Sequence, residues 1–311
     1  MKSALLVVLV GVVGAFHGAS PQERPSVPLA AEVGRISAAT TNEQRFEALT
    51  AILRERDIAF AVEPFTIDKP IGREPRIEAR NIVVTVGEAE ATIVIGSHYD
   101  AARLPDGSLS RGAVDNAASS VILVRLAEML RTERLPLRIR IVWFDMEELG
   151  LIGSQRYVER HAAERNVAML NFDINAYGET IVFGPSERSG NAALRKMLVQ
   201  TCAKEEISCV PFPQMPPGDD RSFVNAAIPT LSVAILPAID AHQLWLMMNA
   251  GAASGLARDT SPAILRTIHT NNDTPEKVDD AAMAKVLRFA ASLVRTVAGM
   301  TGAPSPAPPL R

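Results

Sequence analysis

Apolar and polar positions follow helical and strand periods in turn along most of this chain. Apolar residues recur at helical spacing over residues 42–56, 116–131, 151–163, 191–204, 221–226 and 279–297. Short apolar runs bounded by polar or turn residues predict strands over 59–66, 80–86, 91–96, 137–144, 167–172, 207–212 and 230–236. Strands separated by helices indicate an α/β protein, a three-layer α/β/α sandwich on a mixed, mostly parallel central sheet. The first two strands read as a pair and are expected to make part of that sheet antiparallel.

The two ends of the chain lack this alternation. A basic start at Lys2 followed by the apolar stretch 4–16 matches a secretory signal better than a membrane span, which needs about 20 apolar residues. An uncleaved N-terminal anchor is the alternative. We expect export to the periplasm or medium, with no stable membrane association after cleavage. The predicted organisation is a signal peptide over 1–19, a flexible lead-in over 20–30, a single domain over 31–300 and a proline-rich disordered tail over 301–311.

Composition narrows the classes of function. The chain has 311 residues, of which 47% are hydrophobic, enough for one large core or two small ones. Its net charge is −3, which argues against nucleic acid or an anionic membrane surface as partner. The two cysteines, Cys202 and Cys209, would close a helix-to-strand turn if they formed a disulfide in an oxidising compartment. Two buried free thiols are the equally open alternative.

Two adjacent acids, Glu147 and Glu148, are the most informative feature of the sequence. They follow the apolar run 139–144 at the end of a predicted buried strand. Neighbouring like charges in such a place repel each other and need a compensating cation. A metal ion supplies one if the first carboxylate shuttles protons while the second holds the metal. Asp145, in the same stretch, is expected to face solvent or form a salt bridge.

Further polar residues occupy equivalent places in other predicted elements. His98 and Asp173 lie just past the carboxyl ends of predicted strands, and Asp115 lies just before a helix. In open α/β sheets, ligand sites gather at the carboxyl edge of the strands. We therefore expect these segments to converge, joined by His269 from a loop late in the chain. Asp273 is expected to brace that loop.

The residue types favour zinc, which binds imidazole nitrogen and carboxylate oxygen in proteins. A pair of ions about 3.5–4 Å apart needs one bridging carboxylate and further ligands for each ion. Asp115 is the natural bridge, Glu147 is left as the general base, and Asp100 is placed to orient the imidazole of His98. The five candidate metal ligands are His98, Asp115, Glu148, Asp173 and His269.

Five segments in order resemble the zinc-dependent aminopeptidase family typified by secreted bacterial leucyl aminopeptidases. Its motifs are His-x-Asp, Gly-Ala-x-Asp-(Asp/Asn)-(Ala/Gly), Glu-Glu-x-Gly-Leu-x-Gly-Ser, Asn-x-Asp and His-Thr-x-x-Asp. This chain has them at His98-Tyr99-Asp100, Gly112–Ala117, Glu147–Ser154, Asn171-Phe172-Asp173 and His269–Asp273, within a match over roughly residues 78–300. The resemblance also extends to other zinc exopeptidase-fold proteins, glutaminyl cyclases and the transferrin receptor ectodomain.

The resemblance implies two Zn²⁺ ions with Asp115 shared between them. One ion would be held by His98 and Asp173, and the other by Glu148 and His269. It also implies a cis peptide bond after Asp115. One family motif departs: a loop resembling Ser-Asp-His-x-x-Phe has Asp220 where the histidine usually stands. Because that loop tends to border the substrate pocket, the departure bears on substrate preference.

The expected function is therefore a metallo-exopeptidase, most simply an aminopeptidase acting on peptides with a free N-terminus. Three alternatives stay open. A glutaminyl cyclase shares the scaffold but works with one zinc ion. A carboxypeptidase would need a cation for the substrate carboxylate, such as Arg103 or Arg221. A non-catalytic binding ectodomain would have lost ligands. The sequence does not choose between zinc, cobalt and manganese, which suit similar ligand sets.

Overall fold

The computed structural model describes residues 27–67, 76–251, 254–256, 258 and 261–301. The predicted signal peptide, most of the predicted lead-in and residues 302–311 of the predicted tail lie outside this range. None of the helices in the described part is long and apolar enough to cross a membrane.

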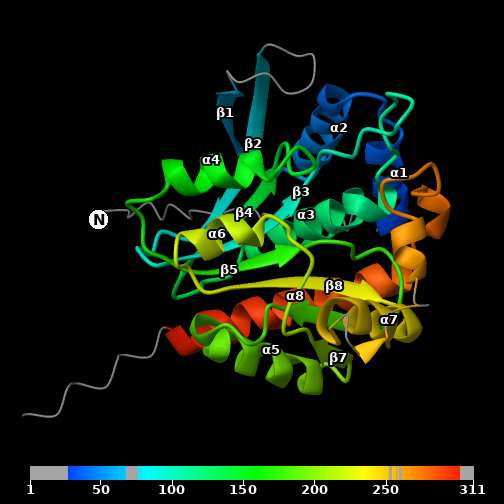
Figure 1. Cartoon of the computed structure of the whole chain (residues 1–311). Coiled ribbons are helices and arrows are strands. Elements are labelled where there is room, and N and C mark those ends of the chain that lie inside the picture. Colours follow the sequence, from blue (N-terminus) through cyan, green and yellow to red (C-terminus); the bar gives the residue numbers. More distant parts are fainter. Residues whose placement is uncertain (1–26, 68–75, 252–253, 257, 259–260, 302–311) are drawn as a thin grey trace, which may run out of the picture.

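The described residues form one mixed sheet of eight strands in the order β1-β2-β4-β3-β5-β8-β6-β7 (Figure 1). Its centre is parallel, because β4, β3, β5 and β8 pair side by side in the same direction. The hairpin β1–β2 joins one edge antiparallel, and β6 pairs antiparallel with β8 before β7 follows it in parallel. The strands are β1 (Ala61–Ile67), β2 (Ile77–Val86), β3 (Thr92–His98), β4 (Arg138–Phe144), β5 (Asn166–Phe172), β6 (Thr180–Gly184), β7 (Ser208–Pro211) and β8 (Thr230–Leu236).

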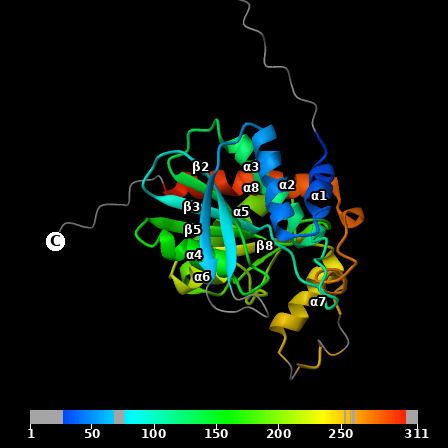
Figure 2. The same cartoon turned by 90° about the horizontal axis from the view of Figure 1, so that it is seen from above.

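Helices cover both faces of the sheet, which confirms the predicted three-layer sandwich. Figure 2 shows α3 and α8 on one side of the strands, and α4 and α6 on the other. The larger buried cluster lies under α3, α5 and α8, and a smaller one around Phe144, Tyr157 and Phe223 lies under α4 and α6. The helices are α1 (Leu29–Ser37), α2 (Asn42–Glu55), α3 (Ala118–Leu130), α4 (Ile152–Arg160), α5 (Ala192–Lys204), α6 (Asp220–Asn225), α7 (Ala238–Asn249) and α8 (Asp280–Thr301).

Most predicted elements are present, with ends shifted by a few residues. The sequence pattern did not predict α1, β6 or α7. Helix α1 begins at Leu29, so the last two residues of the range expected to be a flexible lead-in are helical. Helix α8 likewise continues to Thr301, the first residue of the predicted tail.

The central strand β3 sets the position of the site. All seven of its residues are buried, because both of its faces are covered and both of its edges are paired. It ends at His98, which is paired with Phe144 of β4. The chain leaves β3, β4 and β5 at the same edge of the sheet, and this edge carries the polar side chains of the site.

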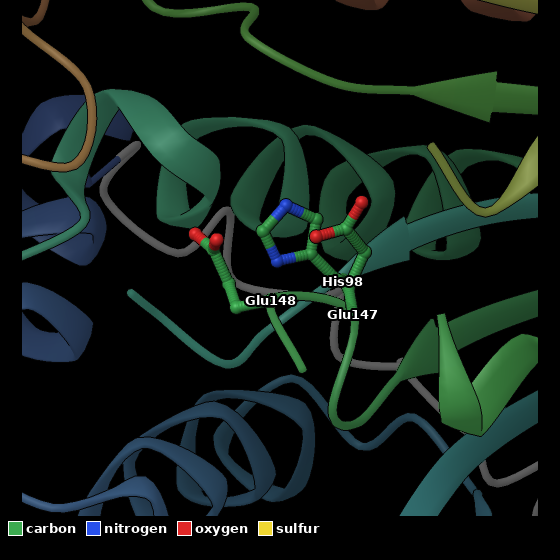
Figure 3. Close-up of side chains that lie close together, drawn as sticks. All are labelled: His98, Glu147 and Glu148. Carbon is green, nitrogen blue, oxygen red and sulfur yellow. The ribbon is translucent and has the colours of Figure 1, made fainter. Parts of the chain in front are cut away.

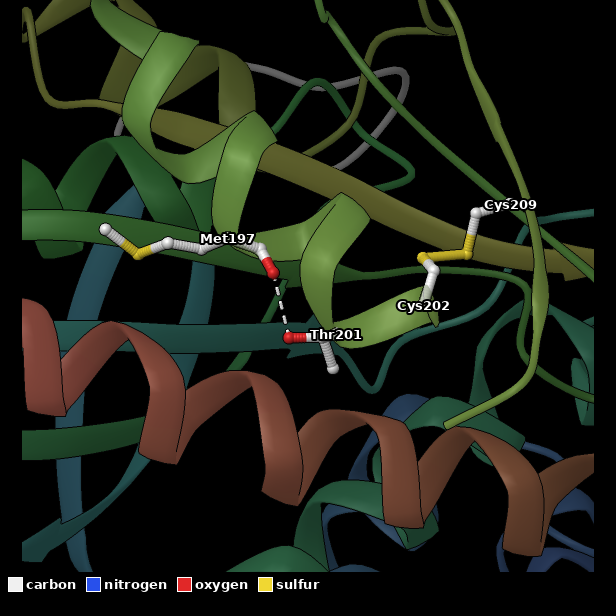
Figure 4. The surroundings of a disulfide bond; sticks show 4 residues. All are labelled: Met197, Thr201, Cys202 and Cys209. Atoms are coloured by element: carbon white, nitrogen blue, oxygen red, sulfur yellow. Dashed lines mark hydrogen bonds between the residues drawn. A yellow bond between two sulfur atoms is a disulfide. The ribbon is translucent and has the colours of Figure 1, made fainter. Parts of the chain in front are cut away.

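The two cysteines lie in α5 and in the edge strand β7, and they are bonded to each other. The disulfide joins Cys202 in α5 to Cys209 in β7, across the helix-to-strand turn expected from the sequence (Figure 4). In the same helix, the hydroxyl of Thr201 donates a hydrogen bond to the carbonyl of Met197 at 2.9 Å. The bridge therefore fixes α5 to the edge strand of the sheet.

Candidate metal centre

The five predicted ligands converge at the carboxyl edge of the central strands. His98 ends β3, Glu148 follows β4 and Asp173 follows β5. Asp115 lies in η1 (Ala113–Ala117), a wide helical turn that leads into α3, and His269 lies in the loop before α8. The side chains fall into two groups of three whose ligand atoms lie within 4.8 Å of one another.

The first group consists of His98, Asp115 and Asp173. The Nε2 atom of His98 lies 3.1 Å from Oδ1 of Asp115 and 3.6 Å from Oδ1 of Asp173. His98 and Asp115 are buried, whereas Asp173 is partly exposed. One imidazole nitrogen thus faces two carboxylates at the end of β3.

The second group consists of Asp115, Glu148 and His269. Nε2 of His269 lies 3.0 Å from Oδ2 of Asp115 and 3.1 Å from Oε2 of Glu148. The side chain of His269 is 54% exposed, so this group is open to solvent on one side. Asp115 belongs to both groups and turns a different oxygen towards each histidine, the disposition of a bridging carboxylate.

Asp115 is held in place through its backbone. Asp273 accepts hydrogen bonds from the amides of Val114 and Asp115 at 2.6 and 3.1 Å, so it braces η1 as well as the loop that carries His269. The Asp115–Asn116 peptide bond is cis, as the family resemblance implies. The Asn116 side chain then bonds the carbonyl of Phe172 at 3.0 Å and the amide of Ile174 at 3.2 Å, on either side of Asp173.

Asp100 connects His98 to the pair of glutamates. Its Oδ1 lies 3.3 Å from Nδ1 of His98, the position expected of a group that orients this imidazole. Its two oxygens also accept hydrogen bonds from the amides of Glu147 and Glu148 at 3.1 and 3.2 Å. Asp100 therefore fixes the backbone of the loop that carries both glutamates.

Glu147 forms a third group with His98 and Glu148. Figure 3 shows the imidazole of His98 between the carboxylates of the two glutamates. Burial, together with the neighbouring Asp219, Asp173 and Asp100, raises the pKa of Glu147 to about 10, against the opposing effect of His98. A positive charge placed among these side chains would lower that pKa and favour the carboxylate.

The other groups respond to the same crowding of buried acids. Burial raises the pKa of Glu148 and of Asp173. Hydrogen bonds to Asp115 and Glu148 raise the pKa of His269 to about 11. Burial alone would lower the pKa of His98, but the surrounding carboxylates raise it well above its usual value. The site thus brings together more carboxyl groups than two imidazoles can keep ionised.

These residues fit a pair of zinc ions. Two imidazoles and three carboxylates are the ligand types that zinc prefers. Oε1 of Glu148 and Oδ1 of Asp173 are buried without a hydrogen-bond partner, which is costly unless a cation or donor reaches them. The unpartnered carboxylate oxygens are therefore the groups that bound cations would satisfy.

One prediction at this edge is wrong. Asp145 neither faces solvent nor forms a salt bridge among the described residues: it is buried, and its carboxylate accepts hydrogen bonds from the Asn42 side chain, the Tyr99 hydroxyl and the Arg80 amide. Burial next to Asp100 raises its pKa to about 6. The polar partners come from elements distant in sequence, so the sequence pattern held no sign of them.

Three further charged residues approach the centre, of which the sequence analysis named only Asp220. Asp219 precedes α6 and is fully buried, and burial raises its pKa to about 7. Asp220, which replaces the usual histidine, is buried beside it. Arg45 of α2 is buried as well. It donates hydrogen bonds to the backbone carbonyls of Tyr99, which precedes Asp100, and of Gly112, which precedes η1. The Asp219-Asp220 pair was visible as a motif, whereas Arg45 looked like an ordinary polar position of a helix.

Two hollows flank the centre. One of about 740 Å³ reaches from Glu148 and Asp100 to the start of α2 and to Arg103. The other, of about 100 Å³, lies beside Asp173 and is walled mainly by apolar side chains, including Ile174, Met215 and Ile268. The acidic centre therefore has a roomy side lined by both polar and apolar residues and a small, mainly apolar side.

The sequence of this chain matches peptidase family M28 over residues 81–294, a stretch that contains all five candidate ligands. The chain belongs to peptidase family M28. This confirms the resemblance drawn from the motifs. One relative, a probable leucine aminopeptidase of Trichophyton verrucosum (strain HKI 0517), is 25% identical over 223 residues, covering 68% of this chain and 54% of the relative. The chain spans about half or less of the length of the curated relatives that it matches first.

Solved structures share the fold of this M28 protein. The glutaminyl cyclase of Porphyromonas gingivalis superposes with a TM-score of 0.67 at 19% identity, covering 86% of this chain and 96% of the cyclase. A zinc aminopeptidase from Bacillus subtilis, BSAP, superposes with a TM-score of 0.55 at 17% identity, covering 70% of this chain and 49% of the other. At these identities the likeness establishes the zinc exopeptidase fold alone.

Proposed function

We propose that this M28 protein is a two-zinc aminopeptidase. The observation that carries the proposal is Asp115, which turns one carboxylate oxygen towards His98 and the other towards His269. Each histidine also faces a second carboxylate, from Asp173 or Glu148. The proposed ligands are thus His98 and Asp173 for one ion, Glu148 and His269 for the other, and Asp115 for both.

Zinc ions bound there would supply the charge that acidifies a water molecule and polarises a substrate carbonyl. Glu147 is the proposed general base because its carboxylate lies next to the side chains of the proposed ligands His98 and Glu148 without being assigned to either ion. It would accept the proton of the water and return it to the leaving amine. Asp100 would hold both His98 and the Glu147 backbone in position for that transfer.

The shape of the site supports hydrolysis near one end of a peptide. The small apolar hollow beside Asp173 has room for one modest side chain, and the larger hollow beside Glu148 has room for the residues that follow. The surplus of carboxylates favours a positively charged amino terminus over a carboxylate. This orientation makes the substrate a peptide with a free N-terminus and an apolar first residue.

The proposal is tested with a panel of substrates, with and without a chelator. The panel holds aminoacyl chromophores with their N-acetylated counterparts, N-acetylated dipeptides with free C-termini and peptides with N-terminal glutamine. Zinc-dependent release of unblocked N-terminal residues is the expected result. Cyclisation of glutamine with one zinc per chain would identify a glutaminyl cyclase. Cleavage of the N-acetylated dipeptides would identify a carboxypeptidase, and activity indifferent to the chelator would refute the metal assignment.

The role of Glu147 is tested by Glu147→Gln, which keeps the size of the side chain and removes its basicity. Loss of a positioned general base should lower kcat by about 10³-fold, within the usual range of 10² to 10⁴. The zinc content of the variant should equal that of the wild type. Near wild-type turnover with zinc bound would exclude Glu147 as the base.

We also propose that the protein works outside the cytoplasm. The disulfide between Cys202 and Cys209 supports this, because such bonds persist in oxidising compartments. The sequence of residues 1–19, with its basic start and short apolar stretch, is consistent with the same destination. Fractionation of cells that express the full chain, followed by N-terminal sequencing of the product, tests export and cleavage together.

A further inference from the structure

Arg45, in the first half of α2, is a buried cation behind the metal centre. Its side chain is wholly inaccessible to solvent. Nε donates a hydrogen bond to the carbonyl of Tyr99 at 2.6 Å, Nη1 to that of Arg111 at 2.8 Å, and Nη2 to that of Gly112 at 3.1 Å. Each of these acceptors is a backbone carbonyl, and none is a carboxylate.

Such an arrangement is unusual for arginine, which is rarely buried without an acidic partner. Hydrogen bonds satisfy the guanidinium donors but leave its charge to be balanced from further away. The acids whose charges attract it are those of the centre, Asp100, Asp115, Glu148 and Asp273. Arg45 therefore interacts electrostatically with the acids of the site and forms no hydrogen bond to a proposed ligand side chain.

The three carbonyls belong to two different loops. Tyr99 lies between His98 and Asp100, directly after β3. Gly112 immediately precedes η1, which carries Asp115, and takes a positive φ of 51°. A Cβ atom at this glycine would lie 2.7 Å from the carbonyl oxygen of Asp115 and 3.2 Å from Nη1 of Arg45. The guanidinium thus joins the segment after β3 to the segment that leads into the turn of Asp115.

Only arginine among the cationic residues suits these contacts. Its planar fork presents five donors in fixed directions and reaches three separate acceptors at once. A lysine ammonium at the same place is a single point charge, and one nitrogen cannot lie at the positions of all three guanidinium nitrogens. The contact geometry and the charge of Arg45 can therefore be separated by substitution.

We propose that Arg45 is a positioning residue that fixes the spacing between His98 and Asp115 and so sets the affinity for zinc. The inference rests on the proposed two-zinc centre. His98 Nε2 and Asp115 Oδ1 lie 3.1 Å apart. Arg45 bonds the residue that follows His98 and the two residues that precede η1, which carries Asp115. The two properties of Arg45 act in opposite directions: its positive charge repels a metal cation, whereas its hydrogen bonds assemble the ligands. The hydrogen bonds prevail.

The test compares Arg45→Met, which removes both charge and donors, with Arg45→Lys, which keeps the charge. Zinc affinity is measured by competition with a chromogenic chelator, and the rise in Tm on adding zinc to the chelator-treated protein is measured alongside. Both variants should bind zinc about 10–100-fold more weakly, the usual effect of losing a group that orients ligands. Their zinc-induced rise in Tm should shrink accordingly.

Arg56→Met is the matched control. Arg56 stands at the other end of α2 and pairs with Glu32 at 2.9 Å and Glu128 at 2.7 Å, away from the proposed ligands. Its replacement should lower the Tm of the zinc-free and zinc-loaded protein equally. If Arg45→Met fails to fold, Arg45→Lys alone decides.

Zinc binding in the Arg45 variants that is as tight as in the wild type, or tighter, would overturn the proposal. It would show that the hydrogen bonds of Arg45 do not strengthen zinc binding. A zinc-induced rise in Tm equal to that of Arg56→Met would do the same. The proposed function fails separately, if the wild type itself binds no zinc or binds zinc and hydrolyses no peptide.

Discussion

Asp273→Ala offers a quantitative test of how η1 is held. The carboxylate of Asp273 accepts hydrogen bonds from two consecutive amides, those of Val114 and Asp115, and all three residues are buried. Alanine leaves both N–H groups without a partner. A buried unsatisfied group costs about 1–3 kcal/mol, so the free energy of unfolding should fall by about 2–6 kcal/mol. That loss is a large share of the roughly 5–15 kcal/mol by which a typical domain is stable.

The assay is urea unfolding of the zinc-free protein, together with zinc titration. Because Asp115 is the proposed bridge, Asp273→Ala should also weaken zinc binding. Asp240→Ala is the matched control: Asp240 is buried and likewise accepts hydrogen bonds from two consecutive amides, those of Ala263 and Ile264 at 3.0 and 3.2 Å. It should lose comparable stability and keep its zinc affinity. A loss below about 1 kcal/mol with unchanged zinc affinity in Asp273→Ala would refute the reasoning.

Three further outcomes are expected. Gly153→Ala should destabilise the protein by about 1–3 kcal/mol in urea unfolding, because the added Cβ would lie 2.2 Å from the carbonyl oxygen of Asp145; an unchanged midpoint would contradict this. Burial lowers the pKa of His161, but Glu63 and Glu164 outweigh it and raise that pKa, so the contribution of His161 to stability is complete below about pH 6.5 and is lost as the pH rises through the raised value. His161→Gln should therefore cost more stability at pH 6 than at pH 9, and equal costs at both would refute the pKa direction. Removing zinc with a chelator should lower the unfolding free energy by about 2.7 kcal/mol for each bound ion, relative to zinc at 100 times its Kd, and an unchanged Tm would exclude tight binding.

The sequence predicted the sheet and the convergence of the site because both follow from local pattern. Long periodic helices and short apolar strands were recognisable, and parallel strands bring their carboxyl ends to one edge. The elements that were missed carry weaker patterns. Strand β6 spans only five residues, and α7 is apolar over so much of its surface that no polar face marks its helical period.

Side chains that act through tertiary contacts could not be predicted in the same way. Arg45 follows two polar residues of the same helix, Glu43 and Gln44, which are exposed. Its sequence context therefore suggests a surface position. Its burial depends on packing against loops more than fifty residues away. Asp145 is similar, since its partners Asn42 and Tyr99 come from separate parts of the chain.

The loops around the centre hold one another rather than being held only by the sheet. Asp100 fixes the amides of the glutamates, Asn116 fixes both sides of Asp173, and Asp273 fixes the turn of Asp115. A substitution that displaces one of these loops should therefore also displace loops that it does not contact directly. Transfer of a single motif to another protein should fail to form the site for the same reason. Insertions remote from this edge of the sheet should leave the hydrogen bonds between these loops intact.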